Sequence, residues 1–232
     1  MEEKKFVDLK KGELAVRDYI KRALGKGGIS SVRIEYTPVG ERIIVSTSRP
    51  GMVIGRRGEK IEALTKILKK HFKLDNPHID IFEIKQPLLD AQLVADETAM
   101  QLERKGSLKL KMIVYRMLQD IMKAGALGVE IVMSGKLPAE RARSWRFAQG
   151  FLKKNGDPAK VVLCAQAQAK TQPGIVGIKV RILPPDAIIH DRIVVDEHLL
   201  SQLQSSDLPV EELIEPEEKP KKRSKKKQEA VN

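Results

Sequence analysis

The spacing of hydrophobic residues divides the first part of the chain into a helix followed by two strands. Apolar residues recur at helical spacing between positions 9 and 24, and a glycine-rich run at 25–28 ends this helix. Alternating apolar residues then predict a strand over 32–36 and another over 42–47, with a Pro-Val-Gly turn between them. We therefore expect a β-hairpin after the first helix.

The next segment predicts two apolar helices joined by a short loop, and then a strand. Val53 precedes the loop Gly-Arg-Arg-Gly at 55–58, and Ile61 begins a helical pattern after it. An Asn-Pro pair ends that pattern, and alternating isoleucines up to Ile84 predict a third strand. The predicted order is therefore helix, strand, strand, looped helix pair, strand.

Two amphipathic helices are predicted beyond the third strand. The first starts at Pro87 and ends at Gly106, and the second follows it directly. The apolar stripe of the first helix consists of Leu88, Ala95, Ala99 and Leu102. The apolar face of the second consists of Leu110, Val114, Met117, Leu118 and Ile121. Both helices need an apolar surface to cover.

Strands that follow these helices supply such a surface. Alternating apolar residues mark four runs, at 129–133, 145–151, 161–169 and 176–182. Trp145 shares its parity with Phe147, which favours a place in the core over stacking on a nucleic-acid base. Two helices on about four strands form an α+β domain.

The composition favours a polyanionic partner. The 232 residues suffice for one large domain or two ordinary ones. Lys and Arg number 43 against 31 Asp and Glu, so the net charge is +12 and the pI is near 9.7. No run approaches the ~20 apolar residues of a transmembrane helix, and the N-terminus has no signal-peptide core. We expect a cytoplasmic protein with no membrane partner and no small-molecule substrate.

Basic residues gather at two places in the second domain. Lys109, Arg116 and Lys123 are seven residues apart and share the polar side of the second helix, where they form a basic ridge. The second basic group, around the turn after the first strand, consists of Lys136, Arg141, Arg143 and Arg146. RNA binding is the functional interpretation of both sets, and plain solvated charge is the alternative.

The C-terminal tail changes the sign of its charge along its length. Between 193 and 218 there are acidic residues but neither Lys nor Arg, and KPKKRSKKK follows at 219–227. Like charges and missing hydrophobic residues predict that 193–232 is largely disordered. The basic run would contact nucleic acid, act as a solubilising tail, or fold back on the acidic stretch.

No catalytic, metal or cofactor site is predicted. A single cysteine, Cys164, excludes an internal disulfide and a thiolate zinc cluster, and the four histidines lack metal-binding spacing. Cys164 has no nearby histidine in a strand-like run, which favours an inert thiol over a nucleophile. Asp186, His190 and Asp191 follow a Pro-Pro break, which is typical of a turn rather than of acid–base chemistry.

The loop at 55–58 resembles the RNA-binding clamp of KH domains, although an ordinary turn has the same glycine spacing. Glycines let the backbone approach a sugar–phosphate strand, and the following helix start directs free N–H groups toward phosphate. The order of elements resembles the type-two KH arrangement, which implies a KH domain over 10–85. The resemblance implies RNA contacts from Gly55, Arg56, Arg57, Gly58 and Lys60.

Five runs in fixed order resemble the family of the third protein of the small ribosomal subunit, in its archaeal or eukaryotic form. They are VIGRRGEKI at 53–61, QLERKGSLKLKMIVYRML at 101–118, GALGVEIVMSGKL at 125–137, ERARSWRF at 140–147 and GIVGIKVRILPP at 174–185. The resemblance implies a second, ribosomal α+β domain over 86–192. It also implies a place on the head of the small subunit, in contact with ribosomal RNA and neighbouring head proteins, where messenger RNA enters.

The same resemblance implies that the start of the second domain's second helix contacts messenger RNA. Lys111 stands at one such position, whereas Met112 and Tyr115 depart from the family's basic pattern. Lys109 and Arg116 would supply charge from adjacent turns.

Three functions follow from these observations. The first is a structural, RNA-binding constituent of the small ribosomal subunit, without enzymatic activity. The second is a free KH protein in RNA processing or regulation. The third is a lyase that cleaves damaged DNA through a lysine imine, as some eukaryotic relatives are thought to do, but the sequence nominates no lysine for it.

Overall fold

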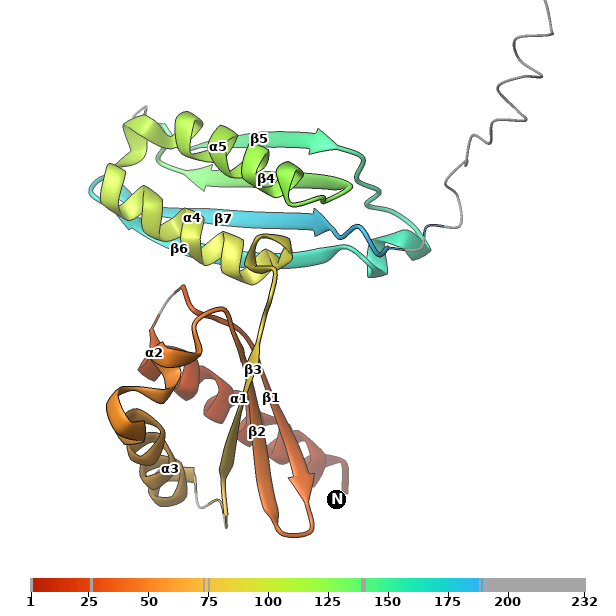
Figure 1. Ribbon diagram of the computed structural model, residues 1–232. Coiled ribbons are helices and arrows are strands. Elements are labelled where there is room, and N and C mark those ends of the chain that lie inside the picture. Colours follow the sequence, from red (N-terminus) through yellow and green to blue (C-terminus); the bar gives the residue numbers. More distant parts are fainter. Residues whose placement is uncertain are drawn as a thin grey trace, which may run out of the picture. The chain divides into compact units, whose positions relative to one another are not determined.

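The computed structural model describes residues 2–25, 27–72, 74, 76–138, 141–187 and 189. The fold is α+β, with a three-stranded sheet in the first part of the chain and a four-stranded sheet in the second (Figure 1). The tail at 193–232, whose disorder the sequence predicts, lies outside the described residues, as do His190 and Asp191.

The first domain contains the predicted helix, hairpin, looped helix pair and third strand. Its elements are α1 (Glu2–Leu24), β1 (Ile29–Thr37), β2 (Gly40–Thr47), α2 (Pro50–Ile54), α3 (Glu59–Phe72) and β3 (His78–Glu83). The order in the sheet is β1-β2-β3, with β1 antiparallel and β3 parallel to β2. This pairing agrees with the predicted order of elements. A short turn joins β1 to β2, which makes them antiparallel, whereas the looped helix pair crosses over between β2 and β3, which makes them parallel.

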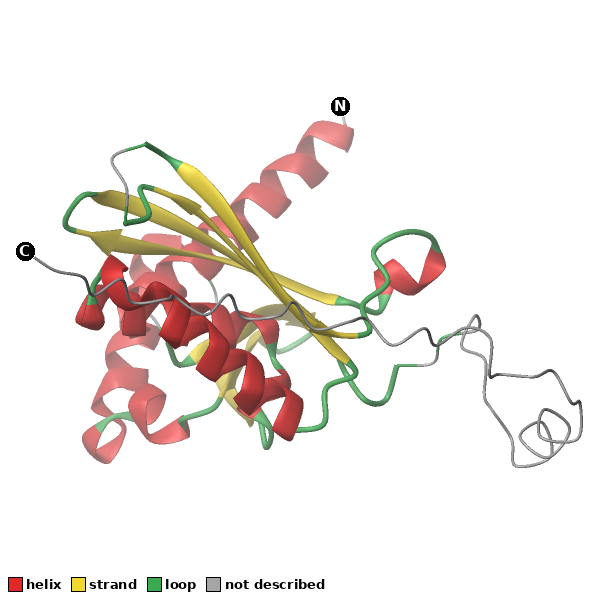
Figure 2. Ribbon diagram, turned by 90° about the horizontal axis from the view of Figure 1, so that it is seen from above, coloured by secondary structure: helices red, strands yellow, loops and turns green. Residues whose placement is uncertain are grey.

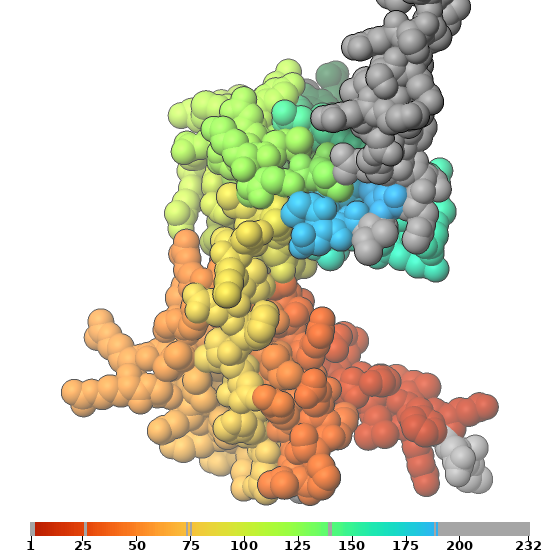
Figure 3. All heavy atoms as spheres, turned by 45° about the vertical axis from the view of Figure 1, so that its right-hand side comes forward, coloured from red at the N-terminus to blue at the C-terminus, as the bar shows by residue number. Residues whose placement is uncertain are grey.

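The core of this domain lies between the sheet and the helices. Apolar residues of α1 and α3, among them Ile20 and Leu68, pack against Ile43 and Val45 of the central strand. The N-terminal part of α1 (red) projects from the rest of the domain (Figure 3), and Phe6 there is exposed. Because these first turns bury no hydrophobic residue, the apolar spacing does not predict them, and α1 begins earlier than expected.

The second domain is a sheet covered on one face by two helices, as predicted (Figures 1 and 2). Its helices are α4 (Ala91–Lys105) and α5 (Leu110–Lys123). Its strands are β4 (Gly128–Gly135), β5 (Arg143–Gly150), β6 (Leu163–Thr171) and β7 (Gly174–Leu183). The strands are antiparallel throughout, in the order β5-β4-β7-β6.

The apolar face of this sheet is buried beneath the helices. All five apolar residues predicted for the face of α5 are buried there, and they pack against Ile131 and Met133 of β4 and Ile178 and Val180 of β7. The central strands β4 and β7 therefore hold most of the sheet's contribution to the core.

Three further boundaries, all in the second part of the chain, differ from the prediction. The first long helix begins at Ala91 and not at Pro87, because Pro87–Leu89 forms a separate 3-10 turn and Asp90 has an extended backbone. Phe151 lies beyond β5, whose last residue Gly150 has a φ of +75°, and its side chain is exposed. Val161 lies before β6, after a 3-10 turn, and is exposed as well.

Asp90 explains where α4 begins. Its carboxylate accepts hydrogen bonds from the backbone N–H groups of Gln92 (2.8 Å) and Leu93 (3.3 Å), and it also accepts one from the Ser30 hydroxyl. A side chain that satisfies the first free N–H groups of a helix in this way is an N-cap.

We expect Asp90→Ala to lower the free energy of unfolding by about 0.5–2 kcal/mol, since the two N–H groups lose their acceptor. Asp90→Asn keeps an acceptor oxygen and should stay close to the unsubstituted protein. Urea unfolding followed by circular dichroism measures both variants. Equal losses in the two would contradict the capping role and assign the effect to the negative charge.

Candidate nucleic-acid interface

The loop at 55–58 interrupts the helical backbone between α2 and α3. Gly55, Arg57 and Gly58 have φ values of +76°, +53° and +82°, so the chain turns sharply between α2 and α3. Arg57 is the only residue other than glycine with positive φ in the described part of the chain. Arg56 and Arg57 are both exposed on this turn. The loop therefore presents two guanidinium groups on a backbone that is held in an unusual conformation.

The two glycines of the loop are needed for different reasons. A Cβ atom on Gly55 would lie 2.7 Å from Cγ of Lys60, so this position has neither the space nor the backbone angle for another residue. A Cβ atom on Gly58 would meet nothing within 4 Å. Crowding therefore does not require glycine at position 58, but its φ of +82° favours glycine, and the space beside it is open.

Lys60 braces the loop as well as adding charge. Its Nζ donates to the carbonyl oxygen of Met52 (3.3 Å), so its side chain connects the start of α3 with α2. Lys60 and Arg56 line a shallow hollow at the loop together with Glu59, which belongs to the first turn of α3. The Glu59 carboxylate offsets part of the positive potential at this helix start, so the exposed arginines are the main source of positive charge at the loop.

A second set of residues meets where α5 packs on β5. The ammonium group of Lys111 lies 4.9 Å from the centroid of the Trp145 ring, which is a cation–π contact. One turn later, Tyr115 meets the ring of Phe147 edge to face at 5.4 Å. Trp145 is half-buried against the core, as its parity predicts. The ring of Trp145 thus favours one position of the exposed Lys111 ammonium group.

The basic ridge is exposed along α5. Lys109 lies immediately before the helix and Lys123 is its last residue, and both are exposed. Arg116, midway between them, is also exposed and lies 4.0 Å from the carboxylate of Asp120. The ridge therefore runs the length of the helix on the side away from the sheet.

The four residues of the second basic group do not form one cluster. Along β5, Arg143 falls on the same side as Trp145, whereas Arg146 falls on the opposite side and reaches Glu130. Lys136 and Arg141 are exposed in the loop between β4 and β5. The four residues therefore do not all present their charge on one face of the sheet, because successive strand residues point to opposite faces.

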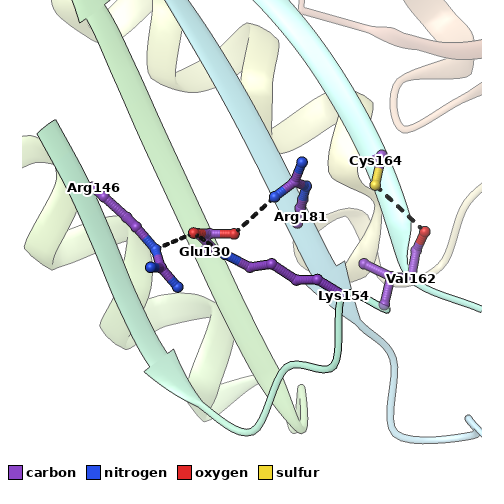
Figure 4. Close-up of polar contacts among 6 residues, drawn as sticks. All are labelled: Glu130, Arg146, Lys154, Val162, Cys164 and Arg181. Carbon is purple, nitrogen blue, oxygen red and sulfur yellow. Dashed lines mark hydrogen bonds and ion pairs between the residues drawn. The ribbon is translucent and has the colours of Figure 1, made fainter. Parts of the chain in front are cut away.

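Glu130, which the sequence analysis did not single out, is the centre of a charged network on the face of the sheet away from the helices (Figure 4). Its side chain is only 1% exposed. Its carboxylate accepts from Nζ of Lys154 (2.6 Å) and Nη1 of Arg181 (3.2 Å), and pairs with Arg146. A signal was present in the sequence, because Glu130 is the one acidic residue in the four strands.

The network sets the protonation state of Glu130. Burial alone would raise the pKa of its carboxyl group, but hydrogen bonds from Lys154, Arg181 and Arg146 outweigh burial and hold the pKa below its ordinary value. The group is therefore ionised at neutral pH, and a single carboxylate neutralises part of three cations.

Of the remaining candidates, Cys164 and Asp186 lie in the described part of the chain. Cys164 is exposed on β6 and its thiol lies 3.7 Å from the carbonyl oxygen of Val162 (Figure 4). Within the described ranges, no cluster of three or more His, Cys, Asp or Glu side chains could hold a metal ion. The same residues include no helix of the length and apolar character needed to cross a membrane. Asp186 is exposed.

Comparison with known proteins agrees with both domains. A KH domain model matches residues 15–89, and the model "Ribosomal protein S3, C-terminal domain" matches residues 98–182. Small ribosomal subunit protein uS3 of Methanocaldococcus jannaschii is 41% identical over 198 residues, which are 85% of this chain and 94% of that protein. The chain belongs to the uS3 family.

Other archaeal members of the uS3 family match over nearly the same length. The protein from Methanosphaera stadtmanae is 36% identical over 198 residues (85% of this chain, 78% of the relative). That from Methanocella arvoryzae is 38% identical over 195 residues (84% and 69%). The predicted resemblance to the third protein of the small subunit is thereby confirmed, and each of these relatives is named as a ribosomal protein rather than as an enzyme.

We expect the double substitution Arg56→Glu with Arg57→Glu to weaken binding of single-stranded RNA at least about tenfold. The log–log dependence of affinity on salt should become less steep by roughly 1.4, since each lost phosphate contact on a single strand contributes about 0.7. Fluorescence anisotropy with a labelled oligonucleotide measures both quantities. Lys69→Glu with Lys70→Glu makes the same change of charge at the far end of α3 and should have much less effect. Equal losses in both double variants would contradict the clamp.

Glu130→Gln should lower the free energy of unfolding by about 1–3 kcal/mol at pH 7, because three charged donors lose an ionised acceptor. The folded-state pKa of Glu130 is depressed, so this stabilisation is present above the unfolded-state pKa (~4.3) and is lost as pH falls through the folded-state pKa. Urea unfolding between about pH 7 and pH 3 should therefore show a flatter acid limb for the variant. Asp120→Asn, which removes an exposed partner of Arg116, should cost less than ~1 kcal/mol. A Glu130→Gln protein as stable as the unsubstituted chain would show that the network is not stabilising.

Proposed function

We propose that the chain is a structural constituent of the small ribosomal subunit, where it binds ribosomal RNA and neighbouring head proteins and helps to form the site where messenger RNA enters. The observation that carries this proposal is the loop at 55–58, where three residues of positive φ present two exposed arginines in a chain of the uS3 family. The mechanism is electrostatic and steric, and no bond is made or broken.

The first domain supplies a backbone clamp for RNA. Open space beside Gly58 admits a sugar–phosphate strand, and Arg56 and Arg57 neutralise phosphates on either side of it. Helix-end attraction contributes only ~0.3–1 kcal/mol. Close backbone contact and the two guanidinium groups therefore account for most of the affinity.

The second domain supplies the contact with messenger RNA. Lys111 contacts the ring of Trp145, and the exposed Lys109 and Arg116 lie two residues before it and five residues after it. A cation that is already held in place loses little conformational entropy when it meets a phosphate. This pre-positioning supports Lys111 as a contact even though Met112 and Tyr115 depart from the family's basic pattern.

The domain limits proposed here are 10–85 and 86–192, followed by the tail at 193–232. The two family matches, at 15–89 and 98–182, fall within or close to these limits. The 3-10 turn at Pro87–Leu89, followed by the Asp90 cap, supports a boundary in the mid-eighties, because it separates β3 from the first helix of the second domain.

Two further functions remain as alternatives. A free KH factor would use the same clamp but bind and release RNA away from ribosomes. A lyase acting on damaged DNA needs a desolvated amine, and borohydride should then trap a covalent complex with abasic DNA. The match to a ribosomal family along both domains favours the ribosomal role over either of these.

Sedimentation of the endogenous protein tests the proposal. We expect near-stoichiometric recovery with small subunits after a lysate passes through a high-salt sucrose gradient, because many simultaneous contacts hold an assembled component. A protein held by charge alone would dissociate under the same wash. Recovery mainly at the top of the gradient would contradict the ribosomal role and support the free KH factor.

A further inference from the structure

The four-stranded sheet has an open face, defined here as the face away from α4 and α5, and the two rows around Glu130 on this face are polar and basic. Toward the ends of β7 the same face carries Leu183, which packs with Val162 and Ile189, and the exposed Ile175. Cross-strand pairing places Glu130 beside Arg181, and in the next row places Val132 between Arg146 and Lys179. Residues paired directly across antiparallel strands point to the same side. The rows continue onto β6 with Cys164 and Gln166, so the open face extends across all four strands.

The charge on the open face is unbalanced. Arg146, Lys179 and Arg181 extend from the strands, and Lys154 reaches the same face from the chain after β5 (Figure 4). Glu130 is the single acidic residue among the four strands. Four cations thus lie on a face with one carboxylate, which contacts Arg146, Lys154 and Arg181 but has no recorded contact with Lys179, and the excess charge is positive.

Glu130 arranges these cations rather than cancelling them. Arg146 and Arg181 keep 62% and 42% of their side chains exposed, although each contacts the buried carboxylate. A guanidinium has five N–H donors, so each arginine retains donors that point to solvent. The network therefore holds the two arginines in fixed positions while leaving them able to bind a second anion.

The side chains on this face suit a phosphate backbone better than a protein surface. Trp145 and Phe147 of β5 point to the helix side, so the open face has no aromatic strand residue on which a base could stack. None of the exposed large hydrophobic residues lies in the two rows around Glu130. Protein interfaces depend on such apolar anchors, whereas helical RNA is bound largely through its phosphates and sugars.

We propose that the open face of the second sheet binds the phosphate backbone of helical RNA, with Arg146, Lys179 and Arg181 as contacts and Glu130 as the residue that positions the arginines. The site is separate from the clamp at 55–58 and from the α5 ridge. This proposal depends on the proposed function in one respect only, which is that the partner is RNA.

Binding of a blunt RNA duplex of about 16 base pairs to the full-length chain tests this site, since that length spans two successive minor grooves. The test variant is Arg146→Gln with Lys179→Gln, and its matched control is Arg104→Gln with Lys105→Gln, which removes two exposed charges at the end of α4. We expect about tenfold weaker duplex binding for the test variant and little change for the control. Circular dichroism checks that both are folded.

The Glu130→Gln variant distinguishes two roles of Glu130, positioning of the arginines and a purely electrostatic effect on the attraction of RNA. The substitution removes a negative charge, so attraction alone predicts tighter duplex binding, whereas loss of the ordered arginines predicts weaker binding. We expect weaker binding from a folded variant. Tighter binding would overturn the positioning role.

Unchanged duplex binding by Arg146→Gln with Lys179→Gln would overturn the RNA site itself, and is the result expected if an acidic protein segment covers this face. The clamp variant Arg56→Glu with Arg57→Glu, measured in parallel, should keep its duplex affinity and lose single-stranded RNA. Failure of the open-face proposal is thereby distinguished from failure of the clamp.

Discussion

The arrangement of the second domain depends on one constraint, the burial of a single face of its sheet. Val129, Ile131 and Met133 must all reach the helices, so β4 cannot shift by one residue without exposing every one of them. The same constraint sends Glu130 to the other side, where no helix covers it. Hydrophobic burial therefore decides on which face of the sheet the charges lie.

A similar constraint operates at the loop of the first domain. Apolar residues on both sides of it, among them Val53 and Leu64, are buried, so α2 and α3 are fixed and the four residues between them must turn within a short span. Positive φ angles at Gly55, Arg57 and Gly58 are the result. The exposed arginines are thus held by packing that lies entirely outside the loop. An RNA-binding loop built in this way needs no ligand to define its shape.

Much of the architecture could be predicted because the apolar periods are regular. The stripe on α5 and the alternation along β7 agree with the burial of those residues, and the hairpin of β1 and β2 forms at the predicted turn. Errors arose where capping decides the outcome. The apolar spacing fits an uninterrupted helix from Pro87. Asp90, however, has an extended backbone, so α4 begins only at Ala91.

The surface was harder to predict than the core because charge has no period of its own. Lys109, Arg116 and Lys123 could be grouped correctly, since a helix of known orientation relates them. Arg143 and Arg146 were grouped by closeness in sequence, although the alternation that places Trp145 toward the core already puts them on opposite faces of β5. The role of Glu130 depends on its contacts with Lys154 and Arg181, which are distant in sequence. Only the folded sheet brings these three residues together.

The position of β5 at the border of its sheet has a further consequence for the chain before assembly. Its outer backbone groups could pair with the strand of another molecule and start aggregation, as unprotected sheet borders do. β5 carries Arg143 and Arg146, and β6 at the opposite border carries Lys170. Like charges at both borders repel a second copy of the chain. The same basic residues that make the protein suited to an anionic partner therefore keep newly made molecules apart until that partner is present.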